Sequence, residues 1–154
     1  MGIEKDIQQS CFRNEFQKMG INIIYTANWL NEKIAHVLTN EEITQQQYNI
    51  LRILRGSECP LSTLKIRERM LDKMSDTSRI VDRLITKGLV EKNACLKDKR
   101  LVDITLSNKG IALVEKLDLY NDQIDAVLKG VTEKDAQLMN QILDKIRAAA
   151  EQQK

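Results

Sequence analysis

Two arginines and a serine lie at four-residue intervals in the middle of this chain. Ser75, Arg79 and Arg83 would therefore share one face of an α-helix, opposite the apolar Ile80 and Leu84. A guanidinium group is planar and can donate two parallel hydrogen bonds to a phosphate or to the edge of a guanine base. The spacing predicts a helix whose polar face can bind double-stranded DNA.

Short hydroxyl side chains cluster at the start of the same predicted helix. Thr77 and Ser78, together with Ser75, would lie in its first turn, where hydroxyls and free backbone amides can bond phosphates or base edges. Asp76 lies among them and has two interpretations. It can cap the helix and favour its dipole, or it can accept a hydrogen bond from a cytosine amine. We favour capping, because a carboxylate here otherwise repels phosphate.

Arg79 is the strongest candidate for reading DNA bases. Losing a bidentate contact between arginine and guanine costs about 1–3 kcal/mol. The alternative is an ion pair with Asp82, three residues later, which would contribute only about 0.2–0.5 kcal/mol. Arg83 also has two interpretations: it contacts DNA, or it ties this helix to the segment that follows.

A charged group stands between two stretches in which apolar and polar residues alternate. It consists of Lys97, Asp98, Lys99 and Arg100, and the alternation around it predicts a β-hairpin with this group at its tip. Arg100 can enter a narrow minor groove, where negative potential attracts arginine, and Asp98 can hold its guanidinium. Lys97 and Lys99 would add phosphate contacts. The alternative is an ordinary solvated hairpin tip.

Positive charge is concentrated in the segment that contains both groups. Residues 61–100 hold eleven Lys or Arg against six Asp or Glu, although the whole chain has a net charge of only +2. Residues 1–60 and 101–154 are each slightly acidic. This asymmetry is typical of a phosphate-facing module on a neutral scaffold, and a merely solvated charged face is the alternative.

The apolar periodicity of the rest of the chain predicts a mainly helical protein. The expected elements cover helices at 5–38, 44–55, 62–70 and 75–87, strands at 89–96 and 101–106, a helix at 107–129, and a last helix from 132 onward. Gly20 is a weak point in the first helix. Thr44 with Gln47 matches a capping box, and Thr132 with Asp135 is an imperfect one.

The order of these elements, two short helices followed by a charged hairpin, is that of a winged helix-turn-helix. The expected fold class is mainly α with a small β-hairpin wing, flanked by long N- and C-terminal dimerisation helices. We expect residues 43–107 to form the DNA-binding lobe. Residues 1–42 and 108–154 would form a helical dimerisation lobe.

Several short motifs carry a resemblance to a known family. They are Arg-Ile-Val-Asp-Arg-Leu at 79–84, Lys-Gly-Leu-Val at 87–90, Asp-Lys-Arg at 98–100, Leu-Ser at 106–107 and Lys-Gly at 109–110. Together they resemble the recognition helix and wing of MarR-type (multiple antibiotic resistance) regulators, and the similarity extends over about residues 10–148. It implies a bacterial or archaeal transcriptional regulator, most simply a repressor, that dimerises through its terminal helices and binds a palindromic operator.

A homodimer requires apolar side chains that face a second copy of the chain. The residues expected to do so are Phe12, Phe16, Leu117, Ile124, Leu138 and Ile142. Two-fold symmetry would then place the two DNA half-sites about one helical turn apart.

The resemblance also implies a control signal. MarR-like proteins often bind small aromatic effectors beside the first long helix, where Tyr25 and Trp29 lie four residues apart, although such a pair is more often part of a core. Cys11 suggests a thiol-based redox sensor as an alternative, with Arg13 as its basic neighbour in the sequence. A winged helix that binds protein rather than DNA is the other alternative.

Several classes of function find no support in the sequence. No nucleophile and base, phosphate loop or carboxylate pair has readable spacing, so we expect no enzyme and no cofactor. The cysteines show no CxxC spacing, so no metal site is expected. No apolar run approaches the ~18 residues of a membrane span and the first residues lack a signal-peptide pattern, so we expect a cytoplasmic protein without a membrane partner.

Overall fold

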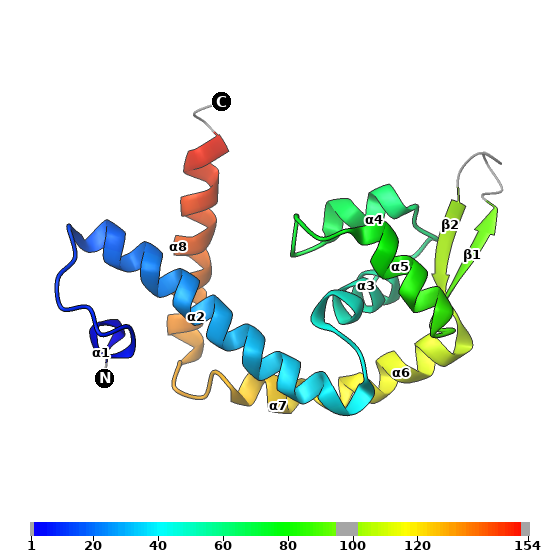
Figure 1. Ribbon diagram of the computed structural model, residues 1–154, viewed down its shortest axis with the longest axis horizontal. Helices are drawn as coiled ribbons and strands as arrows, with labels where there is room; N and C mark the ends of the chain where they lie inside the picture. Colours follow the sequence, from blue (N-terminus) through cyan, green and yellow to red (C-terminus); the bar gives the residue numbers. More distant parts are fainter. Residues whose placement is uncertain (1, 95–101, 152–154) are drawn as a thin grey trace.

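The computed structural model describes residues 2–94 and 102–151 (Figure 1). Its elements, in chain order, are α1 (Ile3–Asp6), α2 (Glu15–Leu38), the 3₁₀ helix η1 (Thr39–Glu41), α3 (Gln45–Arg55), α4 (Thr63–Arg69), α5 (Thr77–Thr86), β1 (Val90–Ala94), β2 (Val102–Leu106), α6 (Asn108–Asp118), α7 (Asn121–Ala126) and α8 (Glu133–Glu151). The mainly helical fold with one antiparallel hairpin is confirmed. Within the described part of the chain, no helix has the length and apolar character needed to cross a membrane.

The helices fall into two groups in space. Figure 1 shows α3, α4, α5 and the hairpin gathered at one end of the molecule, with α1, α2 and α8 at the other. Helices α6 and α7 run along one side and join the two groups. Helix α3 lies at the centre of the first group, because it contacts α2, α4, α5, α6 and β2.

Side-chain caps begin most of these helices where the sequence places them. The hydroxyl of Thr44 accepts from the amide of Gln47, and the Gln47 side chain accepts from the amide of Thr44, which completes the predicted capping box. Thr132 and Asp135 form the same reciprocal pair at α8. The bonds from Thr132 lower the pKa of Asp135. Each such cap satisfies amides that the first helical turn leaves unpaired.

The first long helix starts later than predicted. Helix α2 begins at Glu15, because the side chain of Asn14 accepts a hydrogen bond from the amide of Gln17 and so caps it there. The chain before it turns through Gln8, whose φ is 53°, a left-handed conformation that a helix cannot contain. Gly20 does not interrupt α2.

The helix predicted at 107–129 is two helices. It begins as expected, where Ser107 caps α6, but α6 ends at Asp118. The amides of Leu119 and Tyr120 bond the carbonyls three residues earlier rather than four, which tightens the turn and redirects the chain into α7.

A buried carboxylate joins the end of α2 to α6. The side chain of Glu41, 6% exposed, accepts hydrogen bonds from the ammonium of Lys116 at 2.8 Å and from the hydroxyl of Tyr120 at 2.9 Å. The bond from Lys116 and, to a smaller degree, that from Tyr120 lower the pKa of Glu41. The same contacts raise the pKa of both partners. This cluster connects η1, which directly follows α2, to the end of α6.

Replacing this carboxylate should weaken the junction in a pH-dependent way. We expect Glu41→Gln to lower the free energy of unfolding by about 1–2 kcal/mol at pH 7, because hydrogen bonds to a charged group are lost. Since the folded pKa lies below the unfolded value of about 4.3, the stabilisation exists above that pH and disappears as the pH falls through the folded pKa. Urea unfolding of both proteins from pH 7 down to pH 3 measures the difference.

The matched control is Glu115→Gln on α6, the helix that carries Lys116. Glu115 is well exposed and lies 3.8 Å from Arg55, so its loss should change stability by no more than a few tenths of a kcal/mol, about 0–0.5. An equal loss at pH 7 and pH 3 in the Glu41 variant would contradict the electrostatic explanation.

Candidate nucleic-acid interface

Helix α5 packs by one face and exposes the other. Val81 and Leu84 are buried in the core, whereas Ser78, Arg79 and Arg83 are exposed. The arginines are therefore available to a partner, and Arg79 has 81% of its side chain exposed.

Asp76 caps α5, as the sequence favoured. Its carboxylate accepts from the amide of Arg79 and also lies 3.2 Å from the Arg79 guanidinium. The alternative prediction for Arg79, an ion pair with Asp82, is wrong. Asp76 is the N-cap residue of α5 and lies three residues before Arg79, so its carboxylate contacts the guanidinium. The carboxylate of Asp82 contacts Lys92 instead. The pair is exposed on both sides, so it costs little to break.

Asp82 instead ties the helix to the hairpin. Its carboxylate lies 3.0 Å from the ammonium of Lys92 on β1. A link between this helix and the wing was one of the two interpretations of Arg83, and Asp82 makes such a link instead. Arg83 stays exposed beside this contact.

Two predicted hydroxyl positions differ from expectation. Helix α5 begins at Thr77, so Ser75 lies in the preceding turn, where its hydroxyl donates to the carbonyl of Asp72 at 2.8 Å rather than sharing the helical face. Thr77 is 3% exposed, because the cap at Asp76 turns the first helical residue toward the core. Ser78 alone of the three presents an exposed side chain.

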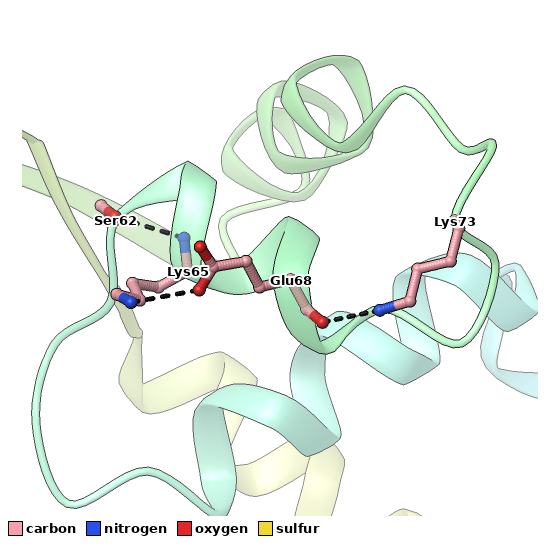
Figure 2. A network of polar contacts seen from close by, with 4 residues as sticks. All are labelled: Ser62, Lys65, Glu68 and Lys73. Atoms are coloured by element: carbon pink, nitrogen blue, oxygen red, sulfur yellow. Dashed lines mark hydrogen bonds and ion pairs between the residues drawn. The ribbon is translucent and has the colours of Figure 1, made fainter. Parts of the chain in front are cut away.

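The turn between α4 and α5 is fixed to α4 by a polar network (Figure 2). Ser62 caps α4 by accepting from the amide of Lys65, whose ammonium pairs with Glu68 at 3.1 Å. The ammonium of Lys73, in the turn, donates to the carbonyl of Glu68 at 2.6 Å. A carbonyl that the end of the helix leaves unpaired is thereby satisfied, and the turn is held in place.

A cleft of about 430 Å³ opens between α4 and the start of α5. Thr63 and Arg67 of α4 line it, together with Asp76, Thr77 and Ser78. Neither Thr63 nor Arg67 was predicted from the sequence. A hydroxyl and a cation four residues apart on a short predicted helix were a weak signal, and only the packing of α4 against α5 brings them to the same site.

The base of the hairpin is held by a very close backbone contact. A Cβ on Gly110 would lie 2.0 Å from the carbonyl oxygen of Leu89, so only glycine fits at this position of α6. The hydroxyl of Ser107 donates to the carbonyl of Gly88 at 2.6 Å and accepts from the amide of Gly110. Gly88, with φ of 70°, follows α5 in a left-handed conformation that glycine adopts without strain.

The two strands pair in the register Val90 to Leu106 through Ala94 to Val102. Ile104 points into the core and bridges to Leu61, which precedes α4, so the hairpin is also fixed to the helix-turn-helix. The predicted tip, Lys97, Asp98, Lys99 and Arg100, lies outside the described residues, and its roles remain predictions.

The apolar residues expected at a dimer interface divide into two groups. Phe16, Leu138 and Ile142 are exposed, and Phe12 and Ile124 are half-buried. Leu117 is 1% exposed, because it packs in the core formed by α3 and α6 of its own chain. The expectation that Leu117 meets a partner is therefore wrong.

The residues considered for a control signal lie apart from the cleft. Tyr25 and Trp29 are partly exposed on α2, and the ammonium of Lys33 lies 5.9 Å from the Trp29 ring. Cys11 is exposed, with its sulfur 3.8 Å from the Ser10 hydroxyl. Among the described residues, no group of three or more His, Cys, Asp or Glu side chains could hold a metal ion.

Comparison with known proteins agrees with this geometry. The sequence model of the MarR family matches residues 43–102, which run from the residue before the Thr44 cap into β2. Through this segment the chain is similar to the MarR family. It is 24% identical over 136 residues to the multiple antibiotic resistance protein MarR of Escherichia coli K12, and the match covers 86% of this chain and 93% of that protein.

Solved structures of MarR-type proteins share the fold. A mutant of Escherichia coli MarR complexed with operator DNA superposes with a TM-score of 0.78 at 24% identity, covering 89% of this chain and 99% of that chain. Bordetella bronchiseptica BpsR, whose DNA binding is regulated by 6-hydroxynicotinic acid, also gives 0.78, at 18% identity over 89% and 98% of the two chains. At these identities the likeness establishes the fold alone.

The close contact between Gly110 and Leu89 predicts that a larger residue at position 110 destabilises the fold. We expect Gly110→Ala to lower the free energy of unfolding by about 1–3 kcal/mol, because the new methyl group must push α6 away from the hairpin. Gly130→Ala is the control, since nothing lies within 4 Å of a Cβ at that position. Urea unfolding compares the two, and equal stability would refute the close contact.

Proposed function

We propose that this chain is a transcriptional regulator of the MarR type, which binds a palindromic DNA operator as a homodimer and acts as a repressor. Helix α5 enters the major groove, where Arg79 and Ser78 contact base edges and Arg83 contacts the backbone. Arg100, held by Asp98, enters the adjacent minor groove. The observation that carries the proposal is the exposed face of α5, whose arginines project from a helix fixed at both ends.

The second copy of the chain is inferred from apolar surface at the other end of the molecule. Phe16 on α2 is 79% exposed and Leu138 on α8 is 55% exposed. Ile142 and Ile146 continue the same face of α8, which is exposed along nearly its whole described length. An extended apolar stripe on a helix that its own chain leaves uncovered is typical of a subunit interface.

Repression and its release are inferred from chemistry and from relatives. A dimer seated across both grooves of an operator excludes other proteins from that DNA. The regulation of BpsR by 6-hydroxynicotinic acid supports a small aromatic effector for this chain, with Tyr25 and Trp29 on α2 as the residues that would contact it. Aromatic side chains suit such a ligand because they stack on its ring.

The DNA-binding proposal predicts distinct effects for its two arginines. Arg79→Ala should weaken operator binding by about 1–3 kcal/mol and relax the preference at one base pair of each half-site. Arg100→Ala should weaken binding most where the flanking minor groove is narrow and A·T-rich. The operator is first selected from a random pool of duplexes, and fluorescence anisotropy then measures affinity for it and for a scrambled duplex.

Arg13→Ala, outside the winged helix, is the control for loss of one charge and should bind as the unaltered protein does. If the pool yields no preferred sequence, or if Arg79→Ala binds the selected operator normally, the proposal fails. A shallow dependence of affinity on salt would instead favour the winged helix that binds protein, since phosphate contacts give a log–log slope of about 0.9 per phosphate.

The dimer proposal predicts that a single charge introduced into the apolar interface dissociates the two subunits. We expect Ile142→Asp to convert the protein to monomers at micromolar concentration, because an unpaired carboxylate cannot be buried in an apolar interface. Asn140→Asp places the same charge on the other side of α8 and should leave the dimer intact. Analytical ultracentrifugation measures both, and a dimer of unchanged stability in the first variant would place the interface elsewhere.

A further inference from the structure

A second cleft, of about 270 Å³, lies at the base of the hairpin. The end of α3, residues 57–60, the end of β2 and Ile111 of α6 line it, and no residue of α5 does. Leu54 and Ile104, which both belong to the buried core, form its apolar floor. The cleft is therefore separate from the exposed face of α5.

Only part of the outer edge of β2 is paired with the rest of the chain. Leu61 forms an isolated bridge with Ile104, in which the amide of each residue donates to the carbonyl of the other, at 3.2 and 2.8 Å. Amides and carbonyls alternate between the two edges of a strand, so those of Leu106 point to the same outer edge. Among the described residues, neither group of Leu106 bonds to backbone outside the hairpin. This residue can therefore still donate and accept.

Residues 57–60 turn away from Leu106 and so create the cleft. Regular antiparallel pairing would bring Cys59 opposite Leu106. The carbonyl of Cys59 instead accepts from the hydroxyl of Ser57 at 2.8 Å, and Pro60 has no amide hydrogen to donate. The cleft therefore has the width of one absent strand residue. Backbone groups that are removed from solvent are nearly always paired, so the edge at Leu106 favours a ligand with an amide of its own.

Two charged side chains at the cleft restrict the charge of that ligand. The guanidinium of Arg55 lies 3.8 Å from Glu115, and both side chains are exposed, so exchanging this carboxylate for another costs little. A guanidinium binds a carboxylate through two parallel hydrogen bonds. Glu58 also lines the cleft and would repel a second negative charge. The pair therefore favours a ligand with a single carboxylate.

We propose that this cleft binds a small N-acylated amino acid with an apolar side chain and one free carboxylate. The N–H of the ligand donates to the carbonyl of Leu106, and its carboxylate accepts from the amide of Leu106 and the guanidinium of Arg55. The ligand thus adds one residue to the edge of β2. Its side chain lies against Leu54 and Ile111. Leu61 occupies the next position on this edge, so the ligand cannot extend past it as a longer strand.

The test titrates the full-length protein with N-acetyl-L-leucine and follows the backbone amide signals by NMR. We expect the amide of Leu106 to shift and to saturate, with a Kd of about 1 mM or below. Arg55→Met should raise this Kd about tenfold, because a charge-assisted hydrogen bond is lost. N-acetyl-N-methyl-L-leucine, which has no N–H, should bind about three- to tenfold more weakly to the unaltered protein.

Arg52→Met is the matched control, since it removes a guanidinium from the same helix outside the cleft and should leave the Kd unchanged. The inference is overturned if the Leu106 signal does not saturate, or if Arg55→Met or the N-methylated probe binds with unaltered affinity. Shifts confined to the surroundings of Tyr25 and Trp29 would also overturn it, because the probe would then occupy the effector site proposed above. No DNA enters these measurements, so their outcome is independent of the proposed DNA binding.

Discussion

The close approach of Gly110 to the backbone of Leu89 is the constraint on which the relative placement of α5, the hairpin and α6 depends. At this point the end of α5, the start of β1, the end of β2 and the first turn of α6 meet, and Ser107 bonds two of them at once. Because the contact joins backbone to backbone, no rotation of a side chain can relax it. The exposed arginines of α5 and the hairpin therefore keep one orientation with respect to α6.

A second joint connects this rigid unit to α2, and it is of a different kind. Glu41 holds Lys116 and Tyr120 through side-chain atoms. Lys87, at the end of α5, also donates to the carbonyl of Glu42, just past η1. These bonds can exchange partners or admit water without disrupting a helix. The path from the apolar faces of α2 and α8 to the arginines of α5 thus passes one contact between backbone atoms and one set of contacts made by side chains.

The features that were predicted correctly from the sequence are those that depend on residues close together in the chain. The capping boxes at Thr44 and Thr132 each depend on residues three positions apart, so the sequence contains all of their determinants. The errors came from contacts between distant elements or from competing local ones. Leu117 has the same periodicity as an interface residue and is buried only because α3 lies against α6.

The parts of the interface that the sequence did not reveal follow the same rule. Arg67, which was not predicted, lies ten residues before the predicted Thr77, and the two line one cleft only because the turn held by Lys73 returns α5 across α4. Asp82 reaches Lys92 only because the chain reverses at Gly88. A pattern on one helix predicts which face is exposed. It does not predict which cations and hydroxyls from a neighbouring helix will share that face, and for a surface that binds a polyanion the shared groups determine where the phosphates can lie.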